Sequence, residues 1–198
     1  NGPFQEKFKQ ALVIENRPGA GGNIAAEAVA KARPDGYTLL LAMSGNLAVA
    51  PASKAGSLPY RVPEDFAPIG LILEAPHGLF VAHNSRFKSA QEFLAAARAQ
   101  KLSFASTGTG AAAHFGMEMV KQAAGIDMLH VPYRGSGPAI QDVLSGQVQV
   151  FMTTPPSVMG HVQAGKLKGL AVTTKQRVPT VPDVPTLSRI RLTWSSVT

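Results

Sequence analysis

The residues with the clearest chemical potential form a loop rich in glycine, serine and threonine, residues 106–110. A short apolar run that reads as a strand precedes this loop, and a helical pattern follows it. Glycine lets the backbone turn tightly and approach a ligand closely. The first turn of a helix has unpaired N–H groups and a partial positive charge, which attract anions. We therefore expect this loop to hold a carboxylate.

Two other interpretations of the same loop are open from its residues alone. Gly108, Gly110 and Ala113 fit the spacing of a dinucleotide-binding fingerprint, which needs an acidic residue after the next strand to bind a ribose. Asp127 has about the right separation, but it precedes the next apolar run instead of following it. The loop can also be an ordinary connection between a strand and a helix, with no ligand.

Two more polar loops follow apolar runs and are candidates for the same site. Residues 132–138 contain Gly, Ser and Pro, and Pro138 suits the first turn of the helix that follows. Residues 44–46 follow a continuous apolar run, at the place where ligands collect in open α/β sheets. An ordinary turn is the alternative for residues 44–46.

Other kinds of chemistry find little support in the sequence. Cysteine is absent, which excludes disulfides, thiolate metal sites and cysteine nucleophiles. No G-x-S-x-G or H-E-x-x-H pattern occurs, so we expect no catalytic residue. His114 and Glu118 lie one helical turn apart, but two ligands do not make a metal site, and His130 is interpreted as structural. We expect neither a metal nor a cofactor.

The composition limits the class of protein and of partner. The 198 residues are 45% hydrophobic, which is enough to bury one sizeable core or two small ones. The formal net charge is +7, but Lys and Arg are scattered, without a basic run that contains aromatic residues. We therefore expect no nucleic-acid partner, and a charge that favours small anions.

The order of the patterns predicts an α/β fold with a mostly parallel sheet, because strand-like runs alternate with helical ones. Asn23 is expected to cap one helix, Ser89 and Glu92 form a capping box for another, and Gly125 ends a third. The expected strands are residues 12–15, 37–43, 69–73, 78–82, 103–105, 128–131, 148–152 and 169–173.

Several motifs together resemble one family of receptors. Residues 15–22 read ENRPGAGG, which is similar to the signature of the Bug (TctC-like) solute-binding proteins of tripartite tricarboxylate transporters. Residues 130–136 read HVPYRGS, where the family has HVPYKGS. The similarity covers roughly residues 8–187. Further matching segments are residues 34–40 (PDGYTLL), 65–68 (DFAP), 106–110, 165–173 and 182–186.

The resemblance implies a two-lobed periplasmic binding protein of the type 2 fold. It places lobe 1 at residues 1–101 with a tail at 188–198, and lobe 2 at residues 102–187. Family members have further chain on both sides of this stretch, so the first lobe is expected to be truncated at both ends. The implied function is a periplasmic receptor, not an enzyme, which delivers a small organic carboxylate to the membrane components of a tripartite tricarboxylate transporter. The alternative is an α/β enzyme that acts on a small anionic substrate.

The resemblance also implies which residues bind the ligand. Amino-acid binders of the family carry Asp where this chain has Thr153, which gives an ammonium group no counter-charge. We therefore expect a ligand without an amino group, such as a dicarboxylate or an aromatic acid. The expected ligand-binding residues are Ser106, Thr107, Gly108 and Gly110, with Ser136, Thr153, Ser44 and Asn46.

Overall fold

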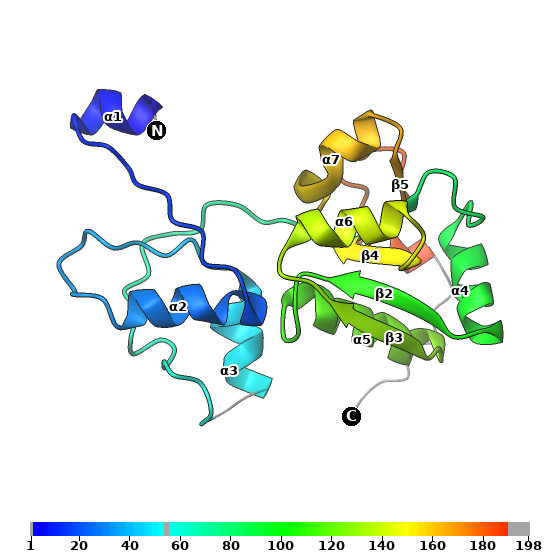
Figure 1. Cartoon of the computed structure of the whole chain (residues 1–198), viewed down its shortest axis with the longest axis horizontal. Coiled ribbons are helices and arrows are strands. Elements are labelled where there is room, and N and C mark those ends of the chain that lie inside the picture. Colours follow the sequence, from blue (N-terminus) through cyan, green and yellow to red (C-terminus); the bar gives the residue numbers. More distant parts are fainter. Residues whose placement is uncertain (1, 54–55, 190–198) are drawn as a thin grey trace.

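The chain folds into two parts that lie side by side (Figure 1), in a computed structural model that describes residues 2–53 and 56–189. We call residues 2–77 the N-terminal part and residues 78–189 the sheet part. The N-terminal part consists of short helices joined by extended chain. Its helices are α1 (Gly2–Phe8), α2 (Asn23–Ala30) and α3 (Ala50–Ser53), with helical turns η1 (Ala20–Gly22) and η2 (Gly45–Val49).

The sheet part is built on one sheet of five strands in the order β3-β2-β4-β1-β5. β2 pairs in parallel with β3 and β4, whereas β1 is antiparallel to both β4 and β5. Four strands therefore run in one direction and only β1 is reversed, so the sheet is mostly parallel, as expected. The strands are β1 (Gly78–Ala82), β2 (Leu102–Ser106), β3 (Met128–Pro132), β4 (Val150–Thr153) and β5 (Leu167–Val172).

Helices cover both faces of this sheet (Figure 1). Successive strand residues point to opposite faces, and in β1 Leu79 packs in one cluster while Phe80 packs in the other. Phe104 and Ala105 of β2 divide in the same way. One face packs against α4 (Ala90–Ala99) and α5 (Ala112–Ala124), and the other against α6 (Ser136–Leu144) and α7 (Pro155–Gln163). A short turn, η3 (Leu187–Arg189), follows.

Most of the expected helix ends are confirmed. The Ser89 Oγ accepts a hydrogen bond from the amide of Glu92 at 3.1 Å, and Glu92 Oε2 accepts one from the amide of Lys88 at 2.9 Å. Gly125 ends α5 in the left-handed conformation. The expected cap at Asn23 is wrong, because Asn23 is the first residue inside α2 and its side chain contacts the Tyr60 hydroxyl instead.

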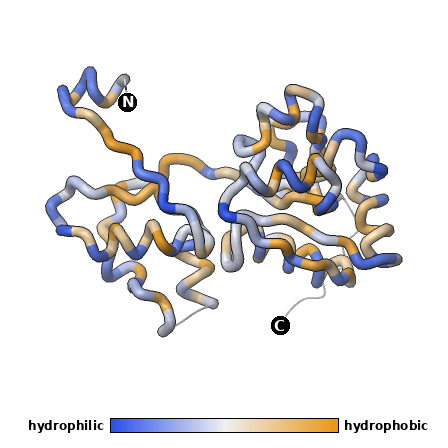
Figure 2. Tube along the Cα trace, in the orientation of Figure 1, coloured by the Kyte–Doolittle hydropathy of each residue, from blue (hydrophilic) through white to orange (hydrophobic). Residues whose placement is uncertain are grey.

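Three expected strands of the N-terminal part do not form. Residues 12–15, 37–43 and 69–73 are extended, but they pair with no strand among the described residues. Their apolar side chains are exposed, with Val13 at 87%, Tyr37 at 91% and Ile69 at 85%, and Figure 2 shows these hydrophobic stretches outside any packed layer. A strand needs a neighbour for its backbone hydrogen bonds, and no described segment supplies one.

The lobe boundaries stay a prediction, and the structure shows where the sheet part begins. The expected first lobe, residues 1–101, includes β1 and α4, yet β1 lies between β4 and β5 and α4 packs on the sheet. We therefore let the sheet part begin at Gly78, the first residue of β1. Of the expected tail at residues 188–198, only residues 188 and 189 are described.

Candidate functional site

Three of the predicted segments meet at one edge of the sheet. β2, β3 and β4 are parallel, so their carboxyl ends share this edge, and α5, α6 and α7 begin just beyond it. Ser106 ends β2, Thr153 ends β4, and Ser136 starts α6. We call this the junction edge, because η2 of the N-terminal part also reaches it.

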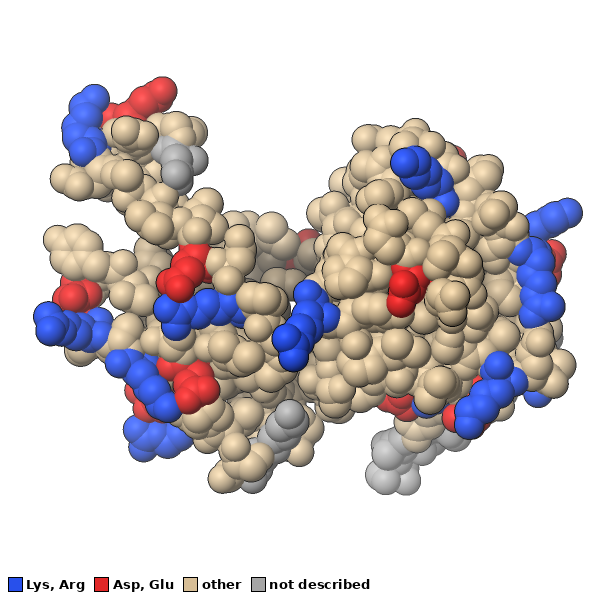
Figure 3. Space-filling view, in the orientation of Figure 1, with Lys and Arg blue, Asp and Glu red and all other residues tan. Residues whose placement is uncertain are grey.

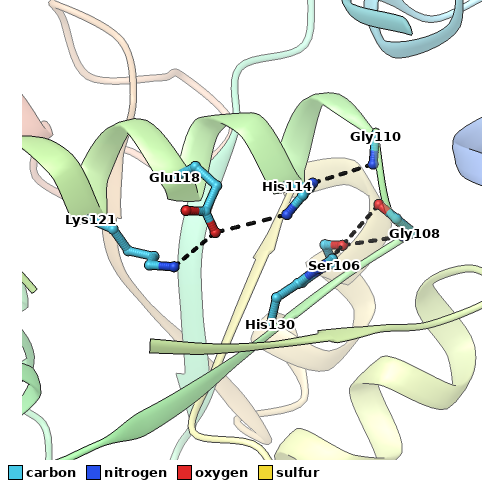
Figure 4. A network of polar contacts seen from close by, with 7 residues as sticks. All are labelled: Ser106, Gly108, Gly110, His114, Glu118, Lys121 and His130. Atoms are coloured by element: carbon cyan, nitrogen blue, oxygen red, sulfur yellow. Dashed lines mark hydrogen bonds and ion pairs between the residues drawn. The ribbon is translucent and has the colours of Figure 1, made fainter. Parts of the chain in front are cut away.

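The glycine-rich loop after β2 is held by side chains of the sheet part (Figure 4). Ser106 is fully buried, and its Oγ lies 2.7 Å from His130 Nε2. The amide of Gly108 donates to Ser106 Oγ at 3.2 Å, and the amide of Gly110 donates to His114 Nδ1 at 3.3 Å. Both glycines have positive φ angles, +135° and +84°, which other residues adopt with strain.

These bonds narrow the set of loop groups that a ligand can reach. The N–H groups of Gly108 and Gly110 already have partners, and the Ser106 hydroxyl is buried. Thr107 is half-buried and Thr109 is exposed. A role of Ser106, Gly108 and Gly110 as ligand donors stays a prediction, and their contacts here shape the loop.

Two stacked histidine rings form the centre of this support. The ring centroids of His114 and His130 are 4.0 Å apart at 15°, and Phe104 stacks on His130 at 4.8 Å. Burial lowers the pKa of His114, and burial together with the neighbouring His114 lowers the pKa of His130 to about 4. Both rings are therefore neutral at neutral pH. Because the Gly110 amide donates to Nδ1, His114 carries its proton on Nε2, which faces Glu118 Oε1 at 3.8 Å.

Ser106 and His130 have the spacing of a nucleophile and its base, but their surroundings do not suit catalysis. Ser106 is fully buried, and a histidine with a pKa of about 4 is a weak base at neutral pH. Glu118 lies 3.0 Å from Lys121 Nζ, so it belongs to an ion pair. Within residues 2–53 and 56–189, no group of three or more His, Asp or Glu side chains is placed to hold a metal.

The predicted loop at residues 44–46 is held by hydrogen bonds within the N-terminal part. Ser44 is exposed, whereas Asn46 is buried. The Asn46 side chain accepts from the amide of Met43 at 3.0 Å and donates to the carbonyl of Gly22 at 3.3 Å. The hydroxyl of Tyr60 lies 2.7 Å from the Asn46 carbonyl oxygen. The Asn46 side chain thus joins η2 to the start of α2.

The two parts touch through backbone at glycine positions. A Cβ added at Gly45 would lie 3.0 Å from the amide nitrogen of Ala112 and 3.3 Å from the Cα of Ala111. A Cβ at Gly21 would lie 3.0 Å from the Ala111 amide nitrogen, and one at Gly108 would lie 3.1 Å from the Gly21 amide nitrogen. The structure therefore brings together residues 19–22, 44–46 and 108–112.

The remaining predicted residues, Ser136 and Thr153, also lie at the junction edge. Ser136 begins α6, and the preceding loop adjoins Gly108, since a Cβ there would lie 3.8 Å from the Tyr133 carbonyl oxygen. Thr153 is buried opposite Gly78 of β1. The sequence prediction omitted Tyr60 and did not assign Gly21 to the site, although the glycine density of residues 19–22 was a signal for close backbone contact.

A surface depression and the charged side chains elsewhere on the molecule lie apart from the residues of the predicted site. A depression of about 580 Å³ lies along α5, and it shares no residue with the predicted site. Lys and Arg side chains are scattered over the face shown in Figure 3 and form no continuous patch there. The residues that line the depression are Phe115, Glu118, Met119, Lys121, Gln122, Gly125 and Ile126.

Comparison with known proteins gives the family. Residues 2–196 match the model of the tripartite tricarboxylate transporter family receptor, TctC. The chain belongs to this family. The match confirms the family that the motifs resemble. The family consists of solute-binding receptors for transport and not of enzymes.

Curated relatives of this TctC chain are longer than it is. It is 36% identical over 203 residues to the protein encoded between tcbD and tcbE in a Pseudomonas species, a match that covers 98% of this chain and 60% of the relative. It is 34% identical over 189 residues to BugT of Bordetella pertussis, covering 94% of this chain and 58% of BugT. The chain thus spans about 60% of the length of these relatives.

Solved structures confirm the α/β fold of periplasmic binding proteins. A periplasmic transporter matches with a TM-score of 0.90 and 36% identity, over 96% of this chain and 64% of that one. MatC from Rhodopseudomonas palustris with bound malate matches at 0.85 and 31%, over 96% and 65%. A second protein of that species, with adipate, matches at 0.87 and 30%, over 96% and 64%. Among the described helices of this chain, none is both long and apolar enough to cross a membrane.

Proposed function

We propose that this chain forms the ligand-binding region of a periplasmic receptor for a small organic carboxylate, which the receptor passes to the membrane components of a tripartite transporter. The observation that carries the proposal is the meeting of residues 19–22, 44–46 and 108–112, which come from both parts, at the junction edge. The family membership supports it, as do the related structures with malate and adipate, which are both dicarboxylates.

The groups at this edge suit a carboxylate. Two helices of nine or more residues, α5 and α6, begin there with N–H groups in their first turns, which attract anions, whereas α7 begins with Pro155 and Pro156, which have no N–H group. A hydrogen bond to a charged group contributes roughly 1.5–3 kcal/mol. Micromolar binding needs about 8 kcal/mol, so three or four such bonds are of the right size. The formal net charge of +7 also favours an anion.

The predicted site supports a ligand without an amino group. All the residues in it are neutral, and the resemblance to the family implies that Thr153 stands where its amino-acid binders carry Asp. The carboxylate of Asp142, which follows in α6, accepts a hydrogen bond from the Tyr133 hydroxyl at 2.6 Å. An ammonium group would therefore lose its water without gaining a counter-charge, which is unfavourable.

Titration calorimetry on the purified chain tests both parts of this proposal. The panel is malate, adipate and benzoate, with aspartate and glutamate as the amino-acid arm. We expect at least one acid of the first group to bind, and aspartate and glutamate to bind at least about tenfold more weakly, a difference of about 1.4 kcal/mol. Binding of aspartate as tight as that of malate would refute the ligand class. No heat with any acid, and no rise in melting temperature, would refute carboxylate binding by this chain.

A further inference from the structure

Gly45 occupies a position where a single methyl group would act on the contact between the two parts. Gly45 starts η2, and its φ lies outside the left-handed range, so alanine is compatible with its backbone. The atoms nearest to an added Cβ all belong to Ala111 and Ala112, at 3.0–3.5 Å. These residues form the start of α5 in the sheet part. The nearest atoms that a methyl group at this position meets therefore belong to the sheet part.

Tyr60 holds Gly45 in this place through the residue that follows it. The Tyr60 hydroxyl lies 2.7 Å from the carbonyl oxygen of Asn46 and 2.9 Å from Asn23 Oδ1, so it shares its one proton between η2 and α2. The side chain is buried, and its ring packs edge-on against Phe66 with centroids 5.6 Å apart. Loss of the hydroxyl would leave two buried acceptors without this donor, which destabilises their arrangement.

We propose that Tyr60 is a positioning residue that fixes Gly45 at the distance which lets the N-terminal part close against the start of α5 around a bound carboxylate. The identity of the ligand in this inference rests on the proposed function, whereas the contact between Gly45 and the start of α5 does not. Closure removes water from the first turn of α5, and electrostatic attraction is stronger where water is excluded. The dissociation rate of the ligand therefore depends on Gly45 and Tyr60, although neither residue needs to touch the ligand.

The test uses Gly45→Ala and Tyr60→Phe in the full chain. Gly160→Ala in α7 is the control for the first variant, since a Cβ there has nothing within 4 Å, and Tyr37→Phe is the control for the second, since Tyr37 is 91% exposed. The chain has no cysteine, so spin labels are attached to Cys introduced by Lys31→Cys and Gln141→Cys, at exposed positions in the two parts. The distance between the labels is measured alone and with malate or adipate, together with the dissociation rate of each acid.

We expect Gly45→Ala to lengthen the mean distance between the labels and to raise the dissociation rate about fivefold or more. Tyr60→Phe should broaden the distances and raise the rate in the same direction, while the two controls match the parent chain. Parental distances and rates in Gly45→Ala would overturn the proposal, and Gly45→Ala decides this even where Tyr60→Phe fails to fold. If the parent chain binds neither acid, the proposed function fails, and the distances without acid still test the contact.

Discussion

At the level of single residues, two neutral histidine rings hold the glycine-rich loop in place. His130 contacts Ser106, and His114 accepts a hydrogen bond from the Gly110 amide. Protonation of His114 would remove this acceptor, and protonation of both rings would place two positive charges about 4.0 Å apart. Glu118 and Lys121 of α5 face the same rings with opposite charges. The shape of the loop therefore depends on both rings staying neutral.

This dependence predicts that stability falls on mild acidification. The pKa of His130 is lowered from 6.5 to about 4, so between these values the unfolded chain binds a proton that the folded chain does not. The contribution is therefore present above pH 6.5 and is lost as the pH falls towards 4. We expect a loss on the order of 1–2 kcal/mol, after allowance for the partial exposure of the ring.

Thermal melting between pH 7 and pH 4 measures this loss. His130→Asn should melt at a lower temperature at pH 7 and should lose less on acidification than the parent chain. His83→Asn is the control, because His83 is an exposed histidine outside the network. An equal acid dependence in His130→Asn and in the parent chain would contradict the assignment.

The conformation of the glycine-rich loop was predictable from the sequence, but the side-chain contacts that hold the loop were not. Gly108 and Gly110 were interpreted correctly as positions for unusual backbone, since both have positive φ angles. The contacts of His130 agree with a structural role, and the role of its partner Ser106 in ligand binding stays a prediction. Stacking between His114 and His130 joins two different elements, and such a contact leaves no periodic pattern in a single sequence.

At the level of elements, the start of α4 offers a clean test of local stabilisation. The Ser89 hydroxyl oxygen accepts a hydrogen bond from the Glu92 amide at 3.1 Å. We expect Ser89→Ala to lower the free energy of unfolding by about 1 kcal/mol, which is roughly 2–4 °C in the melting temperature for a chain of this size. Calorimetric melting measures the change.

The matched control for this variant is Ser44→Ala. Ser44 precedes η2 in the same capping position, but its side chain makes no capping hydrogen bond. Its replacement should change stability by less than about 0.5 kcal/mol. Similar losses in Ser44→Ala and Ser89→Ala would show that the Ser89 cap contributes little.

The elements of the sheet part were largely predictable because their signals are local. The capping box at Ser89, the stop at Gly125 and Pro138 in the first turn of α6 all appear as expected. Residues 37–43 and 69–73 have equally apolar patterns, yet they form no strand in the described chain. A strand depends on a distant neighbour, and no local pattern reports whether that neighbour is there.

At the level of the whole molecule, the two parts differ strongly in how much core they contain. The three clusters of buried apolar side chains all lie in the sheet part. The buried apolar residues of the described N-terminal part are Ala26, Ala50 and Tyr60. Hydrophobic burial is the main favourable contribution to folding, so the sheet part is the more stable of the two.

Limited proteolysis should reveal this difference. We expect the first cuts of thermolysin within residues 37–43 and 67–75, where apolar residues are exposed in extended chain. A resistant fragment that begins near Gly78 should accumulate, because cleavage requires local opening and the sheet part opens rarely. Mass spectrometry identifies the fragments. First cuts inside β2 or β4 would contradict this order of stability.

The position of β1 also constrains how the chain reaches its folded state. β1 comes first along the sheet part, but Gly78 pairs with Thr153 of β4 and with Val172 of β5. Pairings between such distant residues form slowly, because the entropy of closing a long loop is lost before the stabilising contacts form. During synthesis the apolar residues of β1 have no sheet partner until β4 has left the ribosome, and their pairing is complete only after β5 follows. Until then these residues are exposed to binding by a chaperone.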